Sequence, residues 1–126
     1  MNASSVAVCC IGGLHFFFMI GELVPWERPA IMTLVIRKWK QPLDLSANDK
    51  QLLSMVVHNA GVYNGIVAAG LFASLIHGSD AFDVQVALLS GGVIAGLFGA
   101  ATLSKATIVQ AIFGAIALAI VVRYHA

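Results

Sequence analysis

The sequence predicts an all-α integral membrane protein, a four-helix bundle with a short interfacial helix in its first loop. Hydrophobic residues make up 60% of the 126 residues and charged residues only 10%, whereas soluble domains carry about 25% charged residues. Four apolar runs have the length of a membrane span, at residues 6–25, 52–76, 84–104 and 106–122. None of them alternates apolar and polar residues as the strands of an outer-membrane barrel do. We therefore expect one transmembrane domain over residues 1–126.

The first span contains a single charged residue, Glu22. A positive segment before the span and a convincing cleavage site before Glu22 are both missing, so the span is expected to be a retained helix and not a signal peptide. In the loop that follows, apolar residues recur at helical spacing with basic residues between them, at Met32, Val35, Ile36 and Trp39. This pattern favours a helix lying in the membrane interface.

The third and fourth spans are separated by one residue, Lys105, which predicts a tight antiparallel hairpin. Small residues that permit close helix packing are frequent in both spans, and Gly92 and Gly96 form a GxxxG pattern. The packing residues that we expect on these two helices are Gly91, Gly92, Gly96, Gly99, Gln110 and Gly114.

Basic residues lie mainly on one side of the predicted bundle, at Arg28, Arg37, Lys38, Lys40, Lys50 and Lys105. Because Lys and Arg favour the cytoplasmic side, we expect the first loop to face the cytoplasm and both termini to face away from it. The inner membrane of the cell is the expected location, with the lipid bilayer as the surrounding partner. The net charge is only +1 and the basic residues form no long stripe, which argues against a nucleic-acid-binding protein.

Polar residues inside the spans are the candidates for function. In the first span, His15 and Glu22 are seven residues apart, which places them on one helical stripe. The second span holds four hydrogen-bonding side chains within seven residues, namely His58, Asn59, Tyr63 and Asn64. Since these groups cannot all face lipid, we expect this helix to be buried on most of its circumference.

Two interpretations of the second span stay open. In the first, its polar groups hold helices together by hydrogen bonds while Gly61 and Gly65 permit close approach. In the second, they line a polar pocket, in which the amides orient a substrate and His58 is a base or a metal ligand. Standard nucleotide-binding, zinc-protease and hydrolase motifs are absent from the sequence. A single imidazole such as His58 could still bind haem iron.

Three motifs stand in order along the chain: His15-x6-Glu22-x3-Trp26-x2-Pro29, Asn59-x-Gly61-x-Tyr63-Asn64-Gly65, and Ala95-Gly96-x-Phe98-Gly99-Ala100-Ala101-Thr102-x-Ser104-Lys105. In order and spacing they resemble the small bacterial and fungal membrane proteins grouped as domain of unknown function thirteen-oh-four, over roughly residues 10 to 120. The chain departs from this pattern after Trp26, where Glu27 and Arg28 replace two threonines that are frequent in the family. The resemblance implies a membrane location and no settled activity.

A shorter motif, His58-x5-Asn64-Gly65, is similar to the corresponding segment of styrene oxide isomerase. Enzymes of that type are small trimeric membrane proteins that bind haem b, and the haem iron acts as a Lewis acid on an epoxide oxygen. The resemblance implies that His58 is a haem ligand and Asn64 a pocket amide. The Asn and Tyr that the isomerase places in its third helix have no match here.

The function expected from these residues is that of a membrane enzyme acting on a small lipophilic substrate, with an epoxide isomerisation as the example. Its residues would be His58 as haem ligand or base, Asn59, Tyr63 and Asn64 as substrate-orienting groups, and Glu22 and His15 in proton transfer. The alternatives are a proton-coupled transporter that uses Glu22 and a non-catalytic membrane subunit. A homo-oligomer is expected in each case, a trimer by analogy with the isomerase or a dimer for a transporter.

Overall fold

The computed structural model describes residues 2–24, 46–102 and 105–125, and this part of the chain consists of helices without a strand. The four α-helices are α1 (Ala3–Leu23), α3 (Ala47–His77), α4 (Phe82–Thr102) and α5 (Ile108–His125). Two 3-10 turns, η1 (Gly78–Ala81) and η2 (Lys105–Thr107), precede α4 and α5. The predicted four-helix bundle is thereby confirmed. The expected interfacial helix falls on residues 25–45, outside the described residues.

Capping side chains set where the first two helices begin. The Oδ1 atom of Asn2 accepts a hydrogen bond from the backbone N–H of Ser5 at 2.8 Å, so α1 begins before residue 6. Helix α3 begins at Ala47 and not at residue 52, because Ser46 and Asp49 form a capping box. In this box the Oγ atom of Ser46 accepts from the backbone N–H of Asp49 at 3.2 Å.

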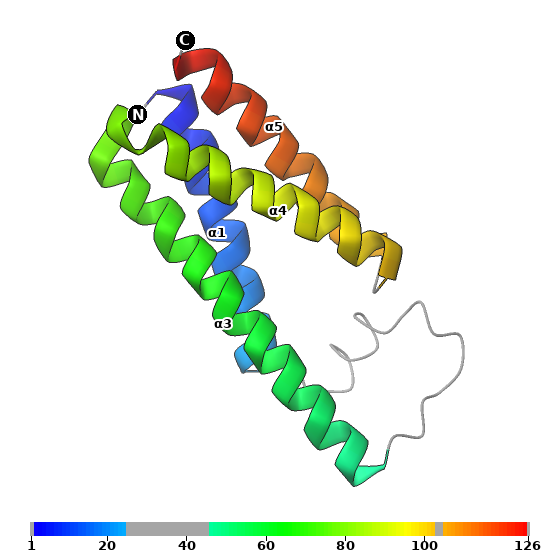
Figure 1. Cartoon of the computed structure of the whole chain (residues 1–126). Coiled ribbons are helices and arrows are strands. Elements are labelled where there is room, and N and C mark those ends of the chain that lie inside the picture. Colours follow the sequence, from blue (N-terminus) through cyan, green and yellow to red (C-terminus); the bar gives the residue numbers. More distant parts are fainter. Residues whose placement is uncertain (1, 25–45, 103–104, 126) are drawn as a thin grey trace.

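By length and composition, α1, α3 and α4 can each cross a membrane, whereas α5 is a shorter apolar helix. The chain is therefore a helical membrane protein. With 31 residues, α3 is about 46 Å long at 1.5 Å per residue, and the hydrocarbon core of a bilayer is about 30 Å thick. The first turns of α3 accordingly project beyond the ends of the other helices (Figure 1).

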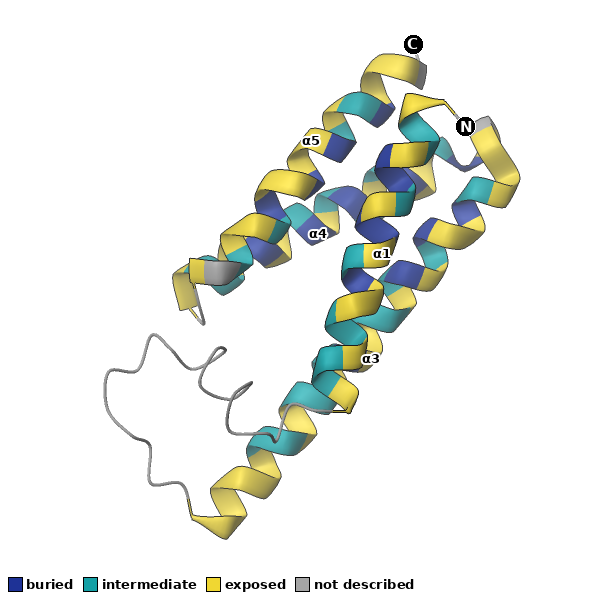
Figure 2. Ribbon diagram, turned by 180° about the vertical axis from the view of Figure 1, so that it is seen from behind, coloured by how far each residue is buried: buried dark blue, intermediate teal, exposed yellow. Residues whose placement is uncertain are grey.

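The helices form two antiparallel pairs, α1 with α3 and α4 with α5. The pairs meet where α1 begins and α5 ends, and they diverge toward the opposite end of the bundle (Figures 1 and 2). The most completely buried side chains are Val8, Leu71, Leu89 and Val121, one from each helix. The apolar core thus lies in the end at which the pairs meet (Figure 2).

Glycines permit close contact within both pairs. A Cβ atom added at Gly96 would lie 2.6 Å from the backbone nitrogen of Ala111, so α4 and α5 touch backbone to backbone there. In the α1–α3 pair, Gly65 makes room for the side chain of Met19. The packing role expected of Gly96 is confirmed, but that of Gly91 is wrong, since no atom lies within 4 Å of a Cβ placed there. Gly91 is on the exposed side of α4.

Candidate functional site

The most deeply placed ionisable side chain of the described residues is that of His15, which is 2% exposed. It lies on the buried face of α1, one helical turn beyond the core residue Ile11. The planes of the Phe18 ring and the imidazole are nearly perpendicular, with an angle of 83° and 6.3 Å between the ring centroids.

A chain of two hydrogen bonds connects His15 to Glu22 through Asn64. The Nδ1 atom of His15 and the Oδ1 atom of Asn64 are 2.7 Å apart. The Nδ2 atom of Asn64 donates to the Oε2 atom of Glu22 at 2.8 Å. We call these three residues, two from α1 and one from α3, the polar centre.

The network determines which imidazole nitrogen carries a proton. A carboxylate has no proton to donate, so Asn64 must present its NH2 group to Glu22 and its oxygen to His15. An amide oxygen only accepts, and Nδ1 of His15 is therefore the donor in the 2.7 Å bond. In the neutral imidazole, Nε2 then holds an unshared electron pair and can accept a proton.

The Nε2 atom of His15 is buried and has no hydrogen-bond partner among the described residues. It faces α4 at Gly92, where an added Cβ atom would lie 3.2 Å away. On the other side of this contact, the Nε2 atom of Gln110 donates to the backbone oxygen of Gly92 at 3.1 Å. The imidazole is thus surrounded by residues of α1, α3 and α4, and Gln110 of α5 binds the backbone of the α4 residue that it faces.

Glu22 and His15 lie at different depths of the bundle. Glu22 is half-buried in the last turn of α1, and His15 lies seven residues earlier, which is a distance of about 10 Å along the helix axis. The hydrogen bonds thus lead from the end of α1 to the interior of the bundle. Such an arrangement can hold a base in one tautomer or conduct a proton between the two depths.

The structure brings together three of the predicted site residues, His15, Glu22 and Asn64, but not the others. Asn59 and Tyr63 lie on the outer side of α3, and Tyr63 is 62% exposed. The expectation that α3 is buried on most of its circumference is therefore wrong. The physical reason is that α3 packs mainly along α1 and to a lesser extent against α4, which leaves one side bare.

His58 is half-buried, and it is not among the hydrogen-bonded residues of the polar centre. It precedes Gly61 by one helical turn, and Gly61 packs against Leu23 at the last residue of α1. Both polar atoms of Asn64 are already engaged on α1. The roles that the isomerase resemblance implies, His58 as haem ligand and Asn64 as pocket amide, stay a prediction.

No group of three or more metal-binding side chains is present in residues 2–24, 46–102 and 105–125. Cys9 and Cys10 in α1 are free thiols. The sequence predicted packing roles for Gly92 and Gln110, and it did not predict that Gly92 contacts His15 or that Gln110 binds the Gly92 backbone. The GxxxG pattern did mark Gly92 as a point of close approach, but the pattern cannot tell which side chain approaches.

The fold and the polar centre define a small helical membrane protein with a buried histidine held by an amide and a carboxylate. Residues 9–122 match the family described as protein of unknown function (DUF1304), and the chain belongs to this family. The family resemblance of the sequence motifs is thereby confirmed. No curated protein and no solved structure matches the chain.

Proposed function

We propose that this protein is a membrane-embedded enzyme in which His15 is a general base toward a small lipophilic substrate. The observation that carries the proposal is the buried Nε2 atom of His15, which has no partner among the described residues. An unsatisfied buried polar atom costs about 1–3 kcal/mol, and unpaired polar groups of this kind concentrate at functional sites.

This observation also weighs against a purely structural role. Polar residues that only hold helices together pair their polar atoms with one another or with the backbone. The amide of Asn64 is paired in this way at both ends, but the imidazole is paired at one nitrogen only. A substrate that donates a proton would supply the missing partner of Nε2.

The roles of the three residues follow from their bonds. His15 would accept the substrate proton at Nε2, and the oxygen of Asn64 would hold Nδ1–H and stabilise the imidazolium that forms. Glu22 would orient Asn64 through Nδ2. This base–orienter sequence is the one found where histidine acts in general-base catalysis.

Isomerisation of an epoxide is the reaction class that we favour. In a substrate whose carbon next to the epoxide ring also adjoins a carbonyl group, that carbon carries an acidic proton. His15 would take this proton, and the released electron pair would form a C=C bond while a C–O bond of the epoxide breaks. The resulting alkoxide would take the proton back, so the product is an allylic alcohol. The reaction is balanced without a co-reactant, and an epoxide small and apolar enough can enter from the bilayer.

The test is conversion of a panel of small epoxy ketones, with 3,4-epoxycyclohexanone first, by the purified protein in proteoliposomes. We expect turnover by the natural chain and a loss of about 10²–10⁴-fold in His15→Phe, the usual contribution of a general base. Asn59→Leu, on the outer side of α3, is the control and should keep full activity. Equal activity of His15→Phe and the natural chain would refute the proposal.

The haem-dependent form of this reaction assigns a different role to His58. If haem b bound to His58, the iron would supply Lewis-acid chemistry on the epoxide oxygen. An absorption spectrum of the protein, expressed with haem precursor and purified in detergent, separates the two forms. We expect no Soret band, and a band that disappears in His58→Ala would move the chemistry from His15 to His58.

Proton-coupled transport is the second candidate, since the hydrogen bonds of the polar centre connect two depths of the bundle. It makes Glu22 the proton site. In vesicles with an imposed proton gradient, Glu22→Gln would then abolish uptake of a lipophilic cation such as tetraphenylphosphonium. The enzyme proposal expects no such uptake in the natural chain.

We further propose that the end of the bundle with Lys50 and Lys105 faces the cytoplasm of the cell and that the chain forms a homo-oligomer. The Lys and Arg bias supports the orientation. A reporter enzyme that is active only outside the cytoplasm, such as alkaline phosphatase, should be active when it is fused to either end of the chain. Mass photometry in nanodiscs measures the oligomeric state, for which a dimer and a trimer are the expected forms.

A further inference from the structure

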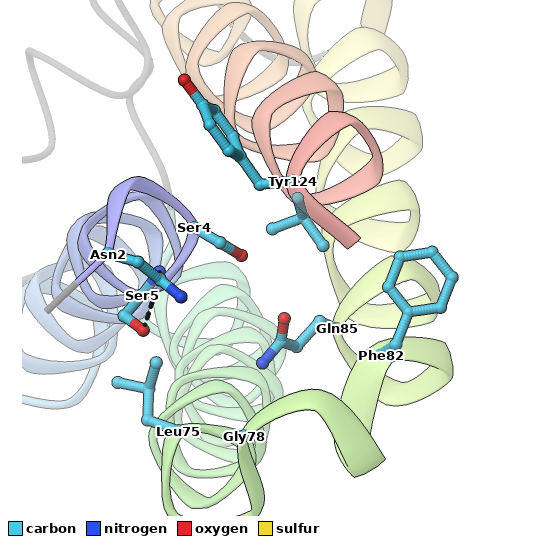
Figure 3. A pocket seen from close by; sticks show the side chains of 9 residues that line it. Asn2, Ser4, Ser5, Leu75, Gly78, Phe82, Gln85 and Tyr124 are labelled. Atoms are coloured by element: carbon cyan, nitrogen blue, oxygen red, sulfur yellow. Dashed lines mark hydrogen bonds between the residues drawn. The ribbon is translucent and has the colours of Figure 1, made fainter. Parts of the chain in front are cut away.

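A second polar site lies at the opposite end of the bundle, where α1 begins, α3 passes into η1, α4 begins and α5 ends (Figure 3). A pocket of about 110 Å³ is lined there by residues of all four helices. Its polar side chains include Asn2, Ser4 and Gln85, and its apolar walls include Leu75 and Val121. It is separate from the polar centre, none of whose residues lines it.

Gln85 is the residue that distinguishes this pocket from an ordinary groove between helix ends. It is only 7% exposed, yet its amide has no hydrogen-bond partner in the part of the chain that the structure describes. Figure 3 shows the amide pointing into the pocket. The side chain is held between helices, but its amide atoms are not covered by the described residues and remain open to the pocket. A group that enters the pocket can therefore bond to both the NH2 group and the oxygen of Gln85.

Two further groups point toward the same space. Asn2 uses its Oδ1 atom to accept from the backbone N–H and the hydroxyl of Ser5, at 2.8 and 2.9 Å. The NH2 group of Asn2 is therefore left to donate, and it is turned toward the pocket (Figure 3). The hydroxyl of Ser4 also points inward, whereas the Tyr124 hydroxyl points away (Figure 3).

The lining determines the chemical class of the ligand. Among the residues that the structure describes, the side chains around the pocket include amides and hydroxyls but no Asp, Glu, Lys or Arg. An ionic ligand would lose its hydration there without gaining a counter-charge, which is unfavourable. The amides and the hydroxyl together offer both donors and acceptors, a combination that a hydroxyl group matches. The volume of 110 Å³ equals that of about four water molecules in the liquid.

We propose that this pocket binds a neutral, hydroxyl-bearing group of about the size of glycerol, with Gln85 as its central partner. The group could belong to a free polyol or to the head of an uncharged lipid such as a diacylglycerol, which the same contacts would recognise. The inference is independent of the proposed enzyme activity, because it uses no residue of the polar centre.

The experiment measures binding of two probes to the full chain purified in detergent. Glycerol is followed by saturation-transfer difference NMR, and dioleoylglycerol by native mass spectrometry against dioleoylphosphatidylcholine. Gln85→Leu removes the amide at nearly constant volume, and Ser4→Ala removes the hydroxyl. Gln51→Leu makes the same change as Gln85→Leu at an exposed position of α3 and is the matched control.

We expect at least one probe to bind, with at least a fivefold loss of occupancy in Gln85→Leu, a smaller loss in Ser4→Ala and none in Gln51→Leu. Binding of glycerol supports a free hydroxyl compound, and binding of dioleoylglycerol alone supports a lipid head. Binding of neither probe to the natural chain would overturn the proposal, as would equal occupancy in Gln85→Leu. A higher melting temperature of Gln85→Leu without any probe binding would mean that the pocket holds water only.

Discussion

At the residue scale, the amide of Asn64 is the connection on which the polar centre depends. It accepts from His15 on one side and donates to Glu22 on the other, so its removal leaves two ionisable groups without their partner. Neither group can turn freely toward water, since His15 is buried and Glu22 half-buried. The same residue therefore contributes to stability and, in the proposed enzyme, sets the tautomer of the base.

We expect Asn64→Leu to lower the free energy of unfolding in detergent by about 1–2 kcal/mol, the range for buried hydrogen bonds in membrane helices. Asn59→Leu is the control on the bare side of α3, and its effect should stay within about 0.5 kcal/mol. Thermal or denaturant unfolding followed by circular dichroism measures both. Equal effects of the two substitutions would contradict the assigned hydrogen bonds.

Substitution of Glu22 separates the role of its charge from that of its hydrogen bond. In Glu22→Gln, the side-chain oxygen can still accept from Nδ2 of Asn64, so we expect a stability within about 0.5 kcal/mol of the natural chain. In Glu22→Leu no acceptor is left, and a loss of about 1 kcal/mol is expected. The same unfolding measurement compares the two variants, and a larger loss in Glu22→Gln would show that the charge itself stabilises the fold.

At the element scale, glycines decide how closely the helices of each pair approach. A methyl group at Gly96 would meet the backbone of Ala111 at 2.6 to 3.0 Å, and a backbone cannot move aside as a side chain can. At Gly65 the nearest atom is the sulfur of Met19, the flexible end of a long side chain. An added methyl group should therefore be tolerated less well at the α4–α5 contact than at the α1–α3 contact.

Three alanine substitutions test this difference. We expect Gly96→Ala to destabilise by about 1–3 kcal/mol, as overpacking does, and Gly65→Ala by less because Met19 can adjust. Gly91→Ala, with open space around it, should be neutral or stabilising by up to about 1 kcal/mol, since alanine favours helix over glycine. Unfolding in detergent ranks the three, and a Gly91→Ala loss as large as that of Gly96→Ala would refute the helix packing.

At the scale of the whole molecule, burial is concentrated at one end. The core of Val8, Leu71, Leu89 and Val121 lies where the two helix pairs meet, while the first turns of α3 extend past the other helices (Figures 1 and 2). Segments with few buried contacts open more readily than the core to which they are attached.

Hydrogen exchange along α3 should therefore fall from its beginning to its end. In detergent, we expect amides in residues 47–56 to exchange at least tenfold faster than those in residues 66–76, which include the core residue Leu71. Exchange followed by mass spectrometry of α3 peptides gives this comparison within one helix. Uniform protection of α3 would indicate that its first turns are covered by a partner.

The sequence by itself determined that this is a helical membrane protein of the family that its motifs resemble. In lipid, every backbone polar group must be paired within its own segment, so an apolar run of span length has to become a helix. The seven-residue spacing of His15 and Glu22 also placed them on one side of the first helix, since helical periodicity depends on spacing alone. What the periodicity could not give was the partner of these two residues.

Only the tertiary structure decided which side of each helix faces another helix. Lipid is as apolar as a leucine side chain, so hydropathy does not distinguish a face in contact with protein from one in contact with lipid. For this reason the sequence alone does not distinguish Asn64 from Asn59 and Tyr63. In the structure, α3 packs on α1 so that Asn64 lies inward and Asn59 and Tyr63 lie outward. The contact of His15 with Gly92 and the burial of Gln85 likewise depend on how the two helix pairs meet.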